Sequence, residues 1–127
     1  MRYLLDTNLL CKETQPRARN WIVQHQLQIA IASMTVAEIA QGIEVSSRGR
    51  RRMRLEGFLR EILEDYQVLP FDTAAALAWG NYVAKAGRPL PVRDSIIAAT
   101  ALANNLEVVT ENEDDFVGVD TVNPLRD

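Results

Sequence analysis

The chain has one cysteine, Cys11, and one histidine, His25, among its 127 residues. A single cysteine excludes an internal disulfide and a zinc site made of several cysteines. His25 lies within a predicted surface helix, which leaves no Ser-His-Asp or Cys-His set for nucleophilic catalysis. Glycine-rich phosphate loops of the G-x-x-x-x-G-K-S/T or G-x-G-x-x-G type are also missing. The sequence therefore excludes disulfide scaffolds, Cys-rich zinc sites and nucleotide-driven chemistry.

Positive charge and long apolar runs are also scarce. The 14 Lys and Arg residues are outnumbered by 17 Asp and Glu residues, which gives a net charge of −3. A nucleic acid would therefore have to meet a local basic patch rather than a general positive field. No apolar run approaches the roughly 18–20 residues that span a bilayer, and the opening MRYLLD meets a charge too early for a signal peptide. We expect a cytoplasmic protein with no membrane partner.

The remaining composition is that of a soluble globular protein, with 47% hydrophobic and 24% charged residues. The length and the absence of a linker or repeat predict one domain over residues 1–127. Apolar runs predict strands, and apolar residues at helical spacing predict helices between them. This alternation predicts an α/β fold, a three-layer sandwich with a central parallel sheet of four to five strands. The predicted strands are 3–5, 27–32, 67–71, 107–110 and 121–122. The predicted helices are 16–26, 35–45, 73–86 and 94–104, and the arginine-rich stretch 48–54 runs into a further helix that ends at about residue 65.

Three acidic residues follow the predicted strands. Asp6 ends the first strand, Glu38 lies in the first turn of the helix after the second strand, and Asp94 opens the helix before the fourth. Each has a structural alternative. Asp6 can be a turn residue, Thr35 and Glu38 match a capping box, and Asp94 can cap its helix. We expect Asp94 to act as a cap and to bind an ion as well.

Considered together, the three acids favour a metal site, because the carboxyl ends of parallel strands meet at one edge of a sheet. Carboxylates that converge there repel one another, so a divalent cation or a raised pKa is expected. A site of carboxylates alone suits Mg²⁺, or Mn²⁺, rather than zinc. The chemistry that remains for such a site is metal-assisted hydrolysis at a phosphoryl group.

Four motifs in order resemble those of PIN domains: Asp6-Thr7-Asn8, Thr35-Val-Ala-Glu38, Asp94-Ser-Ile-Ile-Ala-Ala-Thr-Ala and Thr110-x-Asn112-x-x-Asp115-Phe116. The sequence is most similar to the VapC and FitB type of prokaryotic toxin, over nearly the whole chain. The resemblance implies a PIN-like fold and a Mg²⁺-dependent endoribonuclease. It also implies a cognate antitoxin as a protein partner, and a homodimer. Asp6, Glu38 and Asp94 would then bind the metal.

The fourth acidic position is open between two residues. Asn112 stands where some PIN domains have aspartate, and Asp115 is the nearby acid that many keep. The family often has a basic residue at the position of Glu111, so this chain departs from the pattern with an acidic run, which is usually a solvated face. Supporting roles, in orienting water or the metal ligands, are expected for Thr7, Asn8 and Thr110.

Five arginines lie within seven residues: Arg48, Arg50, Arg51, Arg52 and Arg54. They can form a solvated helix start, contact RNA phosphates or bind an acidic antitoxin segment. Arginines at the amino end of a helix oppose its dipole, which favours a partner. Arg93, next to Asp94, can also contact phosphate or simply be exposed.

Two other functions compete with a nuclease. A receiver-type signalling domain shares the doubly wound fold, with Asp72 as the phosphate acceptor, but it needs a lysine after a later strand and none follows Lys85. A PIN-like module that binds RNA or protein without cutting is the stronger rival. The acids at positions 6, 38 and 94 argue against it.

Overall fold

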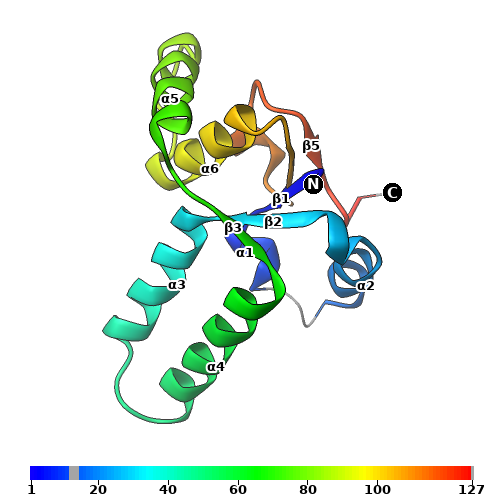
Figure 1. Cartoon of the computed structure of the whole chain (residues 1–127), viewed down its shortest axis with the longest axis vertical. Helices are drawn as coiled ribbons and strands as arrows, with labels where there is room; N and C mark the ends of the chain where they lie inside the picture. The colour runs from blue at the N-terminus through cyan, green and yellow to red at the C-terminus, as the bar shows by residue number, and fades with distance from the viewer. Residues whose placement is uncertain (12–14, 127) are drawn as a thin grey trace.

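The computed structural model describes residues 1–11 and 15–126 and contains one five-stranded sheet (Figure 1). The strands are β1 (Tyr3–Leu5), β2 (Ile29–Ala32), β3 (Gln67–Leu69), β4 (Glu107–Val109) and β5 (Thr121–Val122). Their order across the sheet is β3-β2-β1-β4-β5, and every neighbouring pair is parallel. This confirms the predicted α/β fold, including the short fifth strand.

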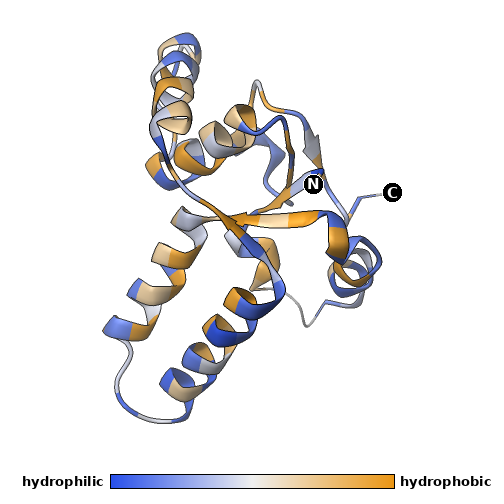
Figure 2. Ribbon diagram, in the orientation of Figure 1, coloured by the Kyte–Doolittle hydropathy of each residue, from blue (hydrophilic) through white to orange (hydrophobic). Residues whose placement is uncertain are grey.

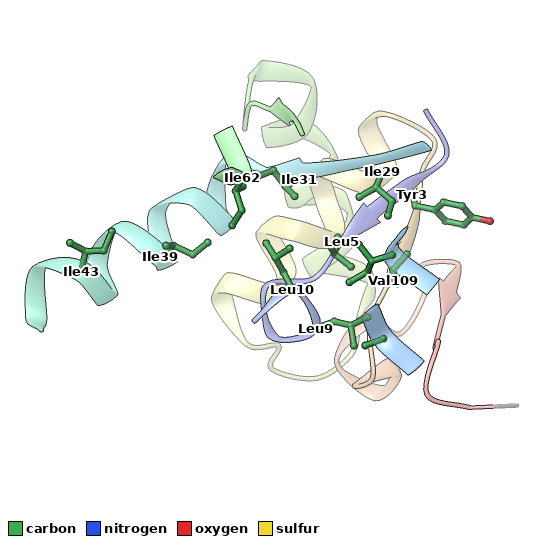
Figure 3. Packing of buried hydrophobic residues seen from close by; sticks show 12 residues of the cluster. Tyr3, Leu5, Leu9, Leu10, Ile29, Ile31, Ile39, Ile43, Ile62 and Val109 are labelled. Carbon is green, nitrogen blue, oxygen red and sulfur yellow. The ribbon is translucent and has the colours of Figure 1, made fainter. Parts of the chain in front are cut away.

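Helices cover the two faces of the sheet. They are α1 (Thr7–Leu10), α2 (Pro16–His25), α3 (Ser33–Val45), α4 (Arg50–Asp65), α5 (Thr73–Lys85) and α6 (Val92–Ala103), with 3₁₀ helices η1 (Gln26–Gln28) and η2 (Glu113–Phe116). Helices α1 to α4 pack on the face that carries Tyr3 and Leu5 (Figure 3). Helices α5 and α6 pack on the opposite face, with Leu4 and Val108. Successive strand residues alternate between faces, so the three layers follow from the strand sequence. None of the described helices has the length and apolar character needed to cross a membrane.

Burial on both faces explains the apolar central strands. All four residues of β2 are buried, as are all three of β1, which is typical of parallel strands between two helical layers. Because all strands run the same way, the residues that follow β1, β2 and β4 lie at one edge of the sheet. This edge holds the acids that the sequence singles out.

Helices α3 and α4 form a hairpin that extends away from the sheet, and the loop between them is its free end (Figure 1). Ile39 and Ile43 of α3 and Ile62 of α4 join the core (Figure 3). Leu55, Phe58 and Leu59 of α4 are partly buried against it. In the loop, Gly49 has φ +143°, a conformation that side chains disfavour. The hairpin is thus anchored by apolar packing and has a polar tip (Figure 2).

Several predicted boundaries are wrong. Strand β2 begins at Ile29 rather than at residue 27, because Leu27 belongs to η1 and is 95% exposed. Helix α3 begins at Ser33, two residues before the predicted start, and α6 begins at Val92. Helix α1 and η2 were not predicted. Val23 of α2 is apolar and yet exposed.

Two helix ends have local explanations. The Asp72 side chain accepts a hydrogen bond from the Ala75 N–H at 3.0 Å and so caps α5. Asn105 follows α6 with φ 56°, in the left-handed conformation expected of it.

Candidate active site

Asp6 lies directly after β1 and is 2% exposed. Its backbone N–H donates to the Val109 carbonyl of the neighbouring strand β4 at 2.9 Å, which fixes it at the sheet edge. Although Asp6 is the N-cap residue of α1, its side chain makes no cap hydrogen bond. Asp6 is therefore a buried acid whose backbone is held by the sheet.

Thr110 links Asp6 to the loop that follows β4. Its hydroxyl donates to Asp6 Oδ2 at 2.9 Å and accepts from the Asn112 N–H at 3.0 Å. Thr110 is fully buried, and its hydroxyl makes both of these hydrogen bonds. The hydroxyl thus fixes the orientation of the Asp6 carboxylate.

Glu38 is held by α1 rather than by the amino end of its own helix. Thr7 Oγ1 lies 3.0 Å from Glu38 Oε1 and 2.9 Å from Thr35 Oγ1. A carboxylate only accepts, so the single Thr7 proton is directed to Glu38 and the Thr35 hydroxyl donates to Thr7. Ala32 is the N-cap residue of α3, and no side chain caps this helix. The predicted capping box is therefore wrong, because α3 begins two residues before Thr35 and places Glu38 beyond its first turn.

Asp94 lies in the first turn of α6, where a negative charge is favourable to the helix dipole. Pro91 is the N-cap residue, and no side chain caps this helix either. The prediction that Asp94 caps α6 is wrong, because the helix begins two residues before it.

The acids act on one another electrostatically. Burial raises the pKa of the Asp6 carboxyl to about 6, the Thr110 hydrogen bond lowers it, and the charges of Asp94 and Glu38 raise it. Burial also raises the pKa of Asp94, and the charges of Asp115 and Glu38 add to the rise. Four acids, one directly after β1 and the others in α3, α6 and η2, thus share one negative field, which favours protons or a cation over an empty site.

The two candidates for the fourth position differ in this field. Asp115 lies in η2, is partly buried and acts on Asp94. Asn112 is exposed, and its recorded contact is the backbone bond to Thr110. Asn8 is exposed as well. Of the two candidates for the fourth acidic position, Asp115 is the one whose charge acts on another acid of the site.

Arg93 introduces a positive charge beside the acids. Its Nη1 lies 3.8 Å from Glu38 Oε2, and its Nη2 donates to Gln41 Oε1 at 2.9 Å. About half of the Arg93 side chain is exposed. The pairing of Arg93 with Glu38 and the contact of Thr35 with Thr7 were not predicted. The partners lie 55 and 28 positions apart in the sequence, respectively, and no local pattern links residues at such separations.

The donor chemistry of the site fits a hard divalent cation. Within residues 1–11 and 15–126, no three His, Cys, Asp or Glu side chains form a group that could hold a metal ion by itself. Mg²⁺ usually keeps several waters and is bound by only one or two carboxylates. The carboxylate oxygens of Asp6 and Asp94, whose pKa values are raised by burial and by neighbouring charges, can serve as ligands of such an ion. The site thus offers oxygen donors of the type that Mg²⁺ prefers.

The remaining candidates lie elsewhere. The arginine stretch occupies the free end of the α3–α4 hairpin rather than the acidic edge (Figure 1). His25 stacks on Trp21, with ring centroids 4.0 Å apart, and its Nδ1 lies 2.7 Å from the Trp21 carbonyl oxygen. His25 therefore packs within α2, as expected of a structural histidine.

Comparison with known proteins agrees with this geometry. The family model described as PIN domain matches residues 3–121. The chain is 33% identical to the plasmid stability protein StbB of Pseudomonas syringae pv. tomato, over 95% of this chain and 96% of StbB. It is 32% identical to the tRNA(fMet)-specific endonuclease VapC of Shigella flexneri, over 91% and 90%. The crystal structure of FitAcB from Neisseria gonorrhoeae superposes with a TM-score of 0.85 at 28% identity, over 98% of this chain and 99% of that chain.

Proposed function

The chain belongs to the PIN domain family, and from this premise we propose that it is a Mg²⁺- or Mn²⁺-dependent endoribonuclease that hydrolyses phosphodiester bonds of RNA. The observation that carries the proposal is Asp6, a carboxylate that is 2% exposed and faces the charges of two further acids. A bound cation would relieve this repulsion and favour the charged form of the carboxylate. Relatives named as a VapC ribonuclease and as a tRNA-specific endonuclease support the reaction class.

Asp6, Glu38, Asp94 and Asp115 would hold the metal ion together, one or two of them directly and the others through its bound waters. When bound, a divalent ion supplies Lewis-acid stabilisation of phosphoryl charge and lowers the pKa of a bound water. Thr110 and Thr7 are positioning residues, because their hydroxyls fix the carboxylates of Asp6 and Glu38. Asn112 would act only through its backbone bond to Thr110, and Asn8 would contact substrate at the exposed rim.

The proposed role is that of the toxin in a type II toxin–antitoxin pair. Solved structures similar to this chain at 26–28% identity include FitAcB and a DNA-bound VapBC from Salmonella typhimurium. By that likeness, an antitoxin encoded beside this chain would bind it and block the acidic edge. A homodimer is a further expectation, and light scattering of the purified protein would test it.

The alternative is a PIN-like module that binds RNA or protein without cutting. The charge cluster disfavours it, because binding without cleavage does not require acids placed so that their charges raise the pKa values of Asp6 and Asp94. The experiment is to sequence RNA ends after a brief pulse of expression. New ends with the parent and none with Asp6→Asn support the nuclease. Equal patterns of RNA ends for both proteins would support the binding module.

A further inference from the structure

The tip of the α3–α4 hairpin is a strongly basic surface in an acidic protein. We define the arginine tip as residues 48–54, which include five of the 14 Lys and Arg residues and no acid. The rest of the chain is left with nine basic and 17 acidic side chains. A polyanion therefore has one strongly favourable place to approach this molecule.

Four of the five arginines of the tip are free to bind. Within the described residues, only Arg52 is paired, with Glu44 Oε1 at 3.6 Å and the Ser46 carbonyl oxygen at 3.4 Å. Arg48, Arg50, Arg51 and Arg54 are exposed and have no ion pair or hydrogen bond there. The charges are also placed against the helix dipole, since α4 has no acid in its first turn and no base in its last. Such placement in the first turn is unfavourable to the helix dipole, which favours a role for these charges other than folding.

The chemistry of the tip suits a nucleotide rather than an acidic peptide. Arg48, Gly49, Arg52, Met53 and Glu56 line a hollow of about 410 Å³. Met53 is 70% exposed and gives this hollow an apolar wall. A guanidinium can hold a phosphate by two parallel hydrogen bonds, while the neighbouring apolar surface can be covered by a base. An acidic peptide would use the arginines and leave Met53 in water.

We propose that the arginine tip is a second RNA-binding site, which holds the phosphate backbone of the substrate at a distance from the acidic edge. This inference rests on the proposed ribonuclease function. A rise of about 1.5 Å per residue separates Glu38 from the end of α3 by about 10 Å. An RNA strand that contacts both the arginine tip and the acidic edge must therefore extend beyond the nucleotides at the cleavage site. The tip favours long substrates without reading their bases.

The test measures binding of oligouridylates of about four and about twenty nucleotides by fluorescence anisotropy in EDTA. All proteins carry Asp6→Asn, so RNA stays uncut and a failure of the nuclease proposal leaves this measurement valid. The tip variant adds Arg50→Gln, Arg51→Gln and Arg54→Gln. The control adds Arg19→Gln, Arg60→Gln and Lys85→Gln, which remove the same charge from exposed positions elsewhere.

We expect the tip variant to lose about tenfold or more of its affinity for the long RNA and to lower the salt slope by about 2. The control should change little, and the short RNA should bind weakly to every protein. Equal affinities of the two variants would overturn the proposal. So would a poly-glutamate peptide that binds the tip more tightly than the long RNA does. A long RNA containing 4-thiouridine should crosslink to the Met53 peptide of the unaltered tip, and crosslinks found only elsewhere would also overturn it.

Discussion

The Asp6 carboxyl group combines burial with a charge at neutral pH. It is 2% exposed, and its pKa of about 6 leaves it mostly ionised at pH 7. Asp6→Asn keeps an oxygen that can accept from Thr110 and removes the repulsion, so the metal-free protein should melt at a higher temperature. Thermal unfolding in EDTA checks this. Asp114→Asn, an exposed acid of the same run, is the control and should leave the melting temperature unchanged. A lower melting temperature for Asp6→Asn would contradict the account.

The pKa of Asp6 also predicts a pH dependence. A folded pKa of about 6 against an ordinary value of 3.8 means that the native state binds a proton more tightly than the unfolded chain. Stability in EDTA is therefore highest below pH 3.8 as far as this group is concerned, and it falls as pH rises to about 6. The raised pKa of Asp94 acts in the same direction. Denaturant unfolding of the parent and of Asp6→Asn across this range should show a smaller fall in the variant. A parallel pH response in both would refute the assignment.

Thr110 offers a test of positioning. Thr110→Val removes the hydrogen bond that lowers the pKa of Asp6, so the pH at which Mg²⁺ begins to bind should move upward. The Asn112 N–H also loses its partner, with a stability cost of about 1–3 kcal/mol. Thr100→Val is the control, since its buried hydroxyl bonds only to the Ile96 carbonyl of its own helix. It should cost stability without moving the pH of metal binding, and a shift of equal size in both would contradict a positioning role.

At the scale of elements, an aspartate lies near the start of both α5 and α6, and only the one at α5 caps its helix. Asp72 caps α5, whereas Asp94 lies inside the first turn of α6 and caps nothing. Asp72→Ala should lower the free energy of unfolding by about 1 kcal/mol and leave the response to Mg²⁺ intact. Asp94→Asn should leave stability in EDTA equal or higher and remove most of the Mg²⁺ response. Chemical denaturation with and without Mg²⁺ measures both, and the reverse pattern would make Asp94 structural.

Elements also show what the sequence can predict. Apolar runs such as Tyr3–Leu5 identify the central strands, because burial on both faces permits few polar residues. Starts of helices were less accurate. Thr35 and Glu38 have the spacing of a capping box, but Thr35 is instead bound to Thr7, a tertiary contact that spacing does not reveal. Leu27 is apolar and exposed, so hydrophobicity alone extended β2 too far.

The same limit applies to the site. Asp6, Glu38 and Asp94 could be proposed from their places after predicted strands, because parallel topology brings strand ends together. Asp115 could not be preferred over Asn112, since the turn of η2 decides which of them nears Asp94. The pairing of Arg93 with Glu38 depends on how α3 packs beside α6, which only the folded chain shows.

At the scale of the whole molecule, metal binding should stabilise the fold. One acid lies directly after β1 and the others in α3, α6 and η2, so an ion that binds them ties together elements from both faces of the sheet. Mg²⁺ should raise the melting temperature by mass action. At a hundredfold excess over its dissociation constant, it should raise the free energy of unfolding by about 2.7 kcal/mol. NaCl at equal ionic strength is the control for screening. No shift at millimolar Mg²⁺ would mean that the free protein does not form the site.

The central claim, hydrolysis of RNA that depends on a metal ion held by these acids, is tested most directly by one cleavage assay on purified protein. RNA is incubated with the parent in Mg²⁺, in EDTA, and in EDTA followed by excess Mg²⁺, beside Asp94→Asn in Mg²⁺. A neutral amide is a poor ligand for a hard cation. The account therefore predicts cleavage by the parent that stops with EDTA and returns with Mg²⁺, and loss of most activity in the variant. Undiminished cleavage in EDTA, or cleavage by Asp94→Asn at the rate of the parent, would contradict it.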